Sequence, residues 1–245
     1  MSFRLEAPKG AFFMDKKVVF YIDGFNFYYG LKIAAEKIDG KPDSNRWKKF
    51  YWLDLVKFCS YFLKDDEQLL YVRYFTARPI NVGKRERQNK LMVVNKAINY
   101  DLLKIIYGKY SDKEVKCGAD CKKIFLLPEE KQTDVNIASA MLEDYFTGIC
   151  DKTVLISADS DLLPPLRVIH QMNKRRGGSH MISNLFPPGK YSSDMYNCTF
   201  NSPKLLSGYR SAFNSALLPE KVKLKDGIIE IPIRWKDYLD NQAGG

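Results

Sequence analysis

Two apolar runs in this chain end close to carboxylates. The run KVVFYI, residues 17–22, is followed directly by Asp23. The run TVLIS, residues 153–157, is followed closely by Asp159 and Asp161. Apolar runs of this length are typical of buried strands. Because the carboxyl ends of parallel strands meet at one edge of a sheet, where ligand sites form, we expect these acids to lie near each other.

A fourth acid, Asp134, is predicted to reach the same edge from a helix. Residues 133–146, TDVNIASAMLEDYF, place Ala138, Met141 and Tyr145 on the helical row that begins at Asp134. Asp134 is therefore the charged head of an apolar stripe that faces the sheet. A single acid at a helix N-terminus is explained well enough by the helix dipole. The helix dipole does not explain four acids that meet at one edge.

Carboxylates held together repel one another, so either some of them take up protons or a cation binds them. A hard divalent ion such as Mg²⁺ or Mn²⁺ suits a set of oxygen ligands. The rest of the chain is basic, with a net charge of +10 and a pI near 9.2, which attracts polyanions such as nucleic acid. Metal-assisted hydrolysis of a phosphodiester is the natural chemistry for such a site.

Strand and helix patterns alternate along the chain in the way an α/β fold requires. Strands are expected at 17–22, 69–76, 104–110, 153–157 and 180–186, and helices at 50–63, 83–103, 133–146 and 161–175, with a polar loop before the third helix. This alternation predicts a central, mostly parallel sheet of five strands or slightly more, with helices on both faces. The expected main domain spans residues 14–200.

The segments on either side of this domain have different patterns. Residues 1–13 have no clear periodicity and are interpreted as an N-terminal extension. Residues 201–245 are interpreted as a C-terminal appendage, with a helix near 204–218 and a hairpin that turns at Asp226–Gly227.

Composition indicates an ordinary globular protein. The chain has 245 residues, 45% of them hydrophobic, and no apolar run as long as a membrane span. Its first residues lack the basic-then-apolar order of a signal peptide, and its five cysteines do not form a regular framework. We therefore expect a cytoplasmic protein without a membrane partner. Homodimerisation is left open.

Two basic runs could contact RNA. GKRERQNK contributes Lys84, Arg85 and Arg87, and NKRRGG contributes Lys174, Arg175 and Arg176. Each run is equally compatible with a solvated helix face, and both interpretations stand. Phe27, Tyr28 and Tyr29 could stack on bases, although at least one of them is expected to lie in the core.

Cysteine and histidine give weaker signals. Cys117 and Cys121 have a spacing compatible with zinc, but no second close pair completes a four-ligand site, so a reduced pair is favoured. His170 and His180 are expected to be structural. The scarcity of histidine argues against a ribonuclease mechanism that uses a histidine pair.

Three blocks of the sequence together resemble the NYN domain family, the PIN-like ribonucleases that include LabA-type proteins. The blocks are YIDGFNFYYG, EEKQTDVNIASAML and VLISADSDLLPPL, in the family's order within residues 17–186. The resemblance implies a PIN-like three-layer α/β/α sandwich, a site for Mg²⁺ or Mn²⁺, and cleavage of RNA.

The resemblance also implies roles for individual residues. Asp23, Asp134 and Asp159 match the metal-binding acids, and Asp161 matches a fourth acid that ligates directly or through water. Asn26 matches an asparagine one turn beyond the first acid, interpreted as orienting water or phosphate. Ser157 matches a small residue before the acid pair, and Asp194 resembles a further family acid. The chain departs from the family at Gln132 and Thr133, where a small residue and an aliphatic one are common.

Competing functions account for fewer of these residues. A haloacid-dehalogenase-like phosphatase requires a second Asp two residues from Asp23, where this chain has Tyr21 and Phe25. A nucleotide transferase that uses Asp159 and Asp161 leaves the other two acids without a role. An RNA-binding or adaptor protein that keeps the fold without cleaving RNA stays open. We predict a metal-dependent endoribonuclease whose catalytic residues are Asp23, Asn26, Asp134, Asp159 and Asp161.

Overall fold

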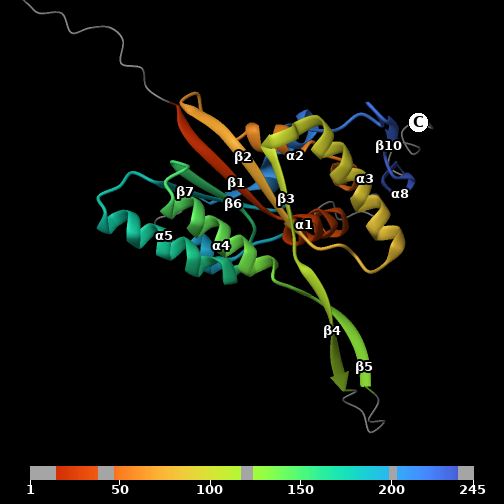
Figure 1. Ribbon diagram of the computed structural model, residues 1–245, viewed down its shortest axis with the longest axis horizontal. Helices are drawn as coiled ribbons and strands as arrows, with labels where there is room; N and C mark the ends of the chain where they lie inside the picture. Colours follow the sequence, from red (N-terminus) through yellow and green to blue (C-terminus); the bar gives the residue numbers. More distant parts are fainter. Residues whose placement is uncertain (1–14, 38–46, 117–123, 199–202, 237–245) are drawn as a thin grey trace, which may run out of the picture.

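The computed structural model describes residues 15–37, 47–116, 124–198 and 203–236, and its centre is a six-stranded parallel sheet (Figure 1). The strand order is β3-β2-β1-β6-β7-β8, and every neighbouring pair is parallel. The strands are β1 (Lys16–Asp23), β2 (Glu67–Thr76), β3 (Leu103–Tyr107), β6 (Lys152–Ile156), β7 (Met181–Phe186) and β8 (Lys204–Leu205). The α/β sandwich expected from the sequence is confirmed, and the two-residue strand β8 extends the sheet beyond five strands.

The middle strand β1 is covered on both faces. Its residues 18–22 have no exposed surface, which explains why they form a continuous apolar run. Val18, Phe20 and Ile22 face one core, whereas Val19 and Tyr21 face the other. This alternation follows from the two-residue period of a strand.

Helices cover the two faces in separate groups (Figure 1). One face packs against α1 (Gly24–Lys37), α2 (Leu55–Ser60) and α3 (Val82–Asn99). The other packs against α4 (Thr133–Phe146) and α5 (Leu163–Arg175). Short helices complete the path: η2 (Lys48–Tyr51), η3 (Tyr100–Leu102), η4 (Ser160–Leu162) and α6 (Ser193–Tyr196). The helix expected over 50–63 is thus shorter than predicted, because Asp54 caps a new helix at Leu55.

The segment after residue 203 contributes to the first core. It contains η5 (Leu206–Gly208), α7 (Arg210–Ser215), the antiparallel strands β9 (Lys221–Leu224) and β10 (Gly227–Glu230), and α8 (Ile233–Lys236). The hairpin lies where the Asp-Gly pair predicts it. Phe213 is fully buried against Phe27 and Phe58. The domain boundary near residue 200 stays a prediction, but this segment shares the core of the main domain.

An antiparallel hairpin replaces the polar loop expected after the third strand. Strands β4 (Lys109–Lys116) and β5 (Ile124–Lys131) pair along their whole length, from Lys109 with Lys131 to Lys116 with Ile124. The hairpin extends away from the body of the molecule (Figure 1). The loop prediction was wrong because many residues here are charged, whereas the two strands satisfy their backbone groups by pairing with each other. Cys117 and Cys121 lie outside the described residues.

Among the described helices, none is both long and apolar enough to cross a membrane.

Candidate metal centre

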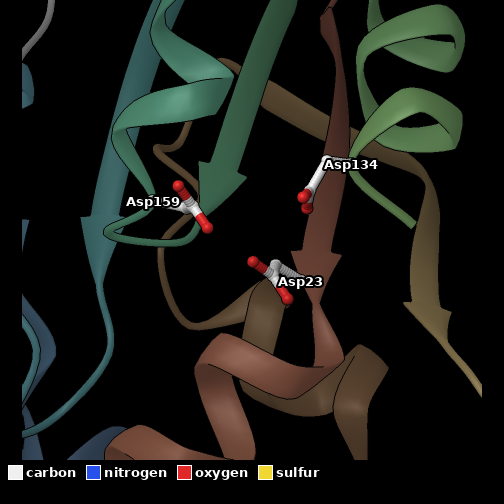
Figure 2. A group of neighbouring side chains, drawn as sticks. All are labelled: Asp23, Asp134 and Asp159. Carbon is white, nitrogen blue, oxygen red and sulfur yellow. The ribbon is translucent and has the colours of Figure 1, made fainter. Parts of the chain in front are cut away.

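Three aspartates meet at the carboxyl edge of the sheet. Asp23 ends β1, Asp134 lies in the first turn of α4, and Asp159 follows β6 just before η4. One carboxylate oxygen from each lies within 4.8 Å of the other two. Figure 2 shows the three side chains directed toward a common space between their elements. The convergence expected from the strand ends is therefore present for these three acids.

The backbone at Asp23 is fixed by the glycine that follows it. A Cβ atom on Gly24 would lie 2.5 Å from the carbonyl oxygen of Phe75 and 2.7 Å from Cζ of Tyr74. Because the neighbouring strand β2 passes so close, only glycine lets α1 begin immediately after Asp23. The Asp-Gly pair thus sets where the first carboxylate projects.

A chain of hydrogen bonds joins Asp23 to Asp159. The Asp159 N–H donates to Ser157 Oγ over 3.0 Å, and Ser157 Oγ donates to Asp23 Oδ2 over 2.9 Å. On the other side, the Asn26 N–H donates to Asp23 Oδ1, and the Asn26 side-chain carbonyl accepts from the Ala158 N–H. Ser157 and Asn26 therefore tie the end of β1 to the loop after β6 and hold the two acids in place.

Asp134 is brought to the edge by an unusual helix start. Gln132, which precedes α4, has a φ of 77°, in the left-handed region that disfavours most side chains. Thr133 behind it is buried, with 2% of its surface exposed. Glycine would adopt this backbone without strain, whereas Gln132 carries a side chain at this φ.

Burial shifts the pKa of the Asp23 carboxyl. Only 4% of the residue is exposed, and this desolvation raises the pKa of Asp23 to about 6. Hydrogen bonds from the Asn26 backbone and the Ser157 hydroxyl oppose the rise, and the charges of Asp134 and Asp159 add to it. A divalent cation bound by the three oxygens would relieve both the desolvation and the repulsion. The donor set thus fits Mg²⁺ or Mn²⁺.

Asp161 and Asp194 lie apart from the three acids. The Asp161 N–H donates to Asp159 Oδ1 over 3.0 Å, and its own side chain is exposed and outside the three-acid group. Asp194 is exposed in α6, where it lines a shallow depression with Ser160 and Arg167. A ligand role for Asp161 stays a prediction.

The two basic runs lie at opposite edges of the sheet. Lys84, Arg85 and Arg87 are in the first turns of α3, which begins shortly after the carboxyl end of β2. Lys174 and Arg175 end α5, just before β7 starts at the amino edge, and Arg176 lies over the rings of Tyr145 and Phe146. Only the first run is brought to the edge that carries the acids.

Sequence reasoning missed the linking roles of Ser157, Asn26 and Gly24. Ser157 was read only as a small residue, and Asn26 as a group for water or phosphate, whereas both make hydrogen bonds inside the site. A signal was present in the sequence, since a hydroxyl two residues before Asp159 can accept from that residue's N–H. Neither histidine belongs to the acid group, and His180 pairs with Thr153 near the opposite edge.

Comparisons with known proteins find a matching family model, a curated relative and a solved structure. The family model described as NYN domain matches residues 17–181. The chain is 28% identical over 181 residues to 6-hydroxy-3-succinoylpyridine 3-monooxygenase HspA of Pseudomonas putida, a match that covers 61% of this chain and 54% of that protein. The chain thus spans about half the length of this curated relative.

A solved structure has a similar fold. A protein of unknown function from Vibrio parahaemolyticus superposes with a TM-score of 0.50 at 14% sequence identity. The match covers 84% of this chain and 98% of that one. At this identity the likeness concerns the fold alone.

Proposed function

The chain belongs to the NYN domain family, and on that premise we propose that it is a metal-dependent endoribonuclease. One observation carries the proposal: the carboxylate oxygens of Asp23, Asp134 and Asp159 lie within 4.8 Å of one another at the ligand-binding edge of a parallel sheet. Membership of a family of PIN-like nucleases and the net charge of +10 support RNA as the substrate.

In this proposal the three aspartates hold one or two Mg²⁺ or Mn²⁺ ions. A bound ion would supply Lewis acidity toward a phosphate oxygen and lower the pKa of a water molecule. The chain's own part is to direct the three carboxylates at one point. Hydrolysis in this site adds water across the P–O3′ bond, leaving a 5′-phosphate and a 3′-hydroxyl.

Ser157 and Asn26 are proposed as positioning residues. The Ser157 hydroxyl donates a hydrogen bond to Asp23 Oδ2, and the Asn26 N–H donates one to Asp23 Oδ1. Both bonds favour the charged carboxylate. The Asn26 side chain holds the loop that carries Asp159 by accepting from the Ala158 N–H. Asp161 is proposed as an outer ligand acting through water, because its side chain lies outside the three-acid group.

The donor set favours hydrolysis over oxygenation as the activity. The Pseudomonas putida relative is named as a monooxygenase, and the match to this chain covers 54% of its length. Non-haem iron(II) oxygenases use a site of two histidines and one carboxylate. The acid group here contains three aspartates and no histidine. Oxygen ligands alone suit Mg²⁺ and Mn²⁺, the ions of phosphodiester hydrolysis.

The direct test is cleavage of a labelled single-stranded RNA with Mn²⁺, Mg²⁺ or a chelator. We expect metal-dependent cutting by the wild-type chain and its loss in Asp159→Asn, which keeps the side-chain shape and removes the charge. Asp151→Asn is a matched control, because Asp151 lies at the amino end of β6. If the folded wild-type chain does not cut under any metal condition, autonomous nuclease activity is excluded and a non-cleaving RNA-binding role is the better explanation.

A further inference from the structure

An aromatic pocket of about 340 Å³ lies next to the acid group on the α1 and α3 side of the sheet. Its lining includes Gly24, the residue that follows Asp23, and reaches α3 and the start of the β4–β5 hairpin. Aromatic side chains from five elements line it: Phe25, Tyr28, Tyr29, Tyr51, Tyr74, Tyr110 and Trp235.

The rings at its mouth leave a flat surface that a planar ligand can use. The rings of Phe25 and Tyr29 are nearly parallel, with centroids 6.5 Å apart, and Tyr110 meets Phe25 edge-on at 6.3 Å. Tyr29 is 43% exposed although it belongs to this cluster. Exposed aromatic rings of this kind stack on the bases of single-stranded nucleic acid.

The charges around the pocket favour an anion. Lys84 and Arg87 of α3 line it, and among the residues that the structure describes no aspartate or glutamate does. The charge of Arg87 reaches Tyr28 in the pocket wall. Burial raises the pKa of Tyr28, and the Arg87 charge lowers it. A phosphate group is the anion that accompanies an aromatic base in RNA, and Lys and Arg both bind it.

The wall also contains an acceptor without a partner. Gln88 lines the pocket, and its Nε2 donates to Thr76 Oγ1 over 2.9 Å and to the Ala77 carbonyl over 3.2 Å. These two bonds fix the amide and leave Gln88 Oε1 buried with no hydrogen-bond partner in the part of the chain that the structure describes. The two Nε2 bonds hold α3 against the end of β2 at the wall of the pocket.

The pocket and the acids are close enough in the fold to act on one strand of RNA. Asp23 and Gly24 are adjacent, and after burial the charge of Asp23 is the next cause that raises the pKa of Tyr74 in the pocket wall. We propose that this pocket binds the base of a nucleotide in single-stranded RNA, with Lys84 and Arg87 at its phosphate, while the backbone crosses the acid group. The inference rests on the proposed function and names the form of its substrate.

The test measures RNA binding in the presence of a chelator, so that the result does not depend on cleavage. The probe is a fluorescein-labelled eight-nucleotide RNA, compared with a series in which one position at a time is an abasic ribose. We expect one abasic position to weaken binding to the wild-type chain by about 10-fold, the scale of one stacked base. Tyr29→Ala and Lys84→Ala change exposed side chains and are expected to weaken binding of the intact RNA.

The abasic penalty should disappear in Tyr29→Ala, because the base then has no ring to stack on. Tyr100→Ala and Lys96→Ala are the matched controls, an exposed aromatic residue and an exposed cation near the end of α3 away from the pocket. Both are expected to bind like the wild type. Thermal unfolding of every variant checks that the fold is kept.

Three results would overturn the pocket assignment. They are an equal effect of abasic sites at every position, wild-type affinity in both Tyr29→Ala and Lys84→Ala, or saturable binding of nicotinate, an aromatic acid, with none of RNA. If the protein cuts RNA but these variants leave RNA binding unchanged, the nuclease proposal stands and the pocket assignment is wrong. If one abasic position weakens binding but the protein never cuts RNA, the pocket assignment stands and the nuclease proposal is wrong.

Discussion

The Ser157 hydroxyl donates a 2.9 Å hydrogen bond to Asp23 Oδ2, across the ends of two adjacent strands. Ser157 is fully buried and also accepts from the Asp159 N–H. One side chain thus sets the spacing between two of the three acids. A metal site that depends on this spacing should respond to Ser157 even though the residue is not one of the three acids.

Ser157→Ala is expected to weaken metal binding without removing a carboxylate. The lost hydrogen bond raises the pKa of Asp23 further, so protons compete better with the metal at pH 7. Outer partners of metal ligands are typically worth 10–100-fold in affinity, and a similar loss of Mn²⁺ affinity is expected here. Titration calorimetry with Mn²⁺ measures it.

Ser160→Ala is the matched control, since Ser160 is exposed in the next turn. Its Mn²⁺ affinity should equal that of the wild type. Equal affinities in Ser157→Ala and the wild type would show that the spacing of the acids does not depend on this bond.

Gly24→Ala is expected to lower the free energy of unfolding by about 2 kcal/mol or more. The added Cβ would lie 2.5 Å from a backbone oxygen of β2, and backbone cannot turn aside as a side chain can. Gly208→Ala is the control, because no atom lies within 4 Å of its added Cβ. Urea denaturation of both variants gives the comparison, and equal stabilities would mean that α1 can shift away from β2.

The strongest local patterns in the sequence predicted most of the sheet and three of the four acids. The runs before Asp23 and Asp159 are buried on both faces, so most of their residues are apolar and the strands are plain in the sequence. The place of Asp134 followed from helical periodicity. Each of these inferences needs only a few consecutive residues and the rule that parallel strands end at one edge.

Features that depend on distant residues could not be predicted in this way. Strands β4 and β5 gain their backbone bonds from each other, and the charged residues of β4 gave no strand pattern that would have indicated this pairing. The core position of Phe213 depends on Phe27, far away in the chain. The opposite placement of Lys84 and Lys174, by contrast, was predictable, because a helix that follows a parallel strand begins at the carboxyl edge and ends at the amino edge.

Asp144 is expected to be essential for holding α4, the helix that carries Asp134. Its carboxylate is 1% exposed, accepts from the Tyr21 hydroxyl over 2.6 Å and pairs with Arg73 of β2. Asp144→Ala leaves the half-buried Arg73 without its partner, which typically costs about 3–5 kcal/mol. Urea denaturation should show this loss, and it should show little change in Glu143→Ala, whose side chain is exposed.

A double variant separates the lost charge partner from lost packing. Asp144→Leu with Arg73→Met removes both charges, so it should be more stable than Asp144→Leu alone. If the double variant is as unstable as the single one, the unpaired charge of Arg73 is not the cause.

The stability of the metal-free chain should fall as the pH rises through 6 because of Asp23. Its pKa in the folded chain is about 6, against an ordinary value of 3.8, so the folded chain binds this proton more tightly than the unfolded chain does. The resulting stabilisation is complete below pH 3.8 and is lost as the pH rises through 6, with a size of about 3 kcal/mol. Asp23→Asn has no such proton and lacks this dependence.

The difference between the wild type and Asp23→Asn isolates this effect from other titrating groups. In the presence of a chelator, the free energy of unfolding of the variant should rise relative to that of the wild type by about 2.5 kcal/mol between pH 4 and pH 8, as measured by urea denaturation. At pH 8, Mn²⁺ should make the wild type the more stable chain again. The ion stabilises the folded wild type by binding the deprotonated Asp23 carboxylate, and the variant lacks this ligand. A constant difference across this pH range would mean that Asp23 is already charged at pH 4. The rise in the pKa of Asp23 that burial and the two neighbouring acids cause would then have to be offset by more than the Ser157 and Asn26 hydrogen bonds.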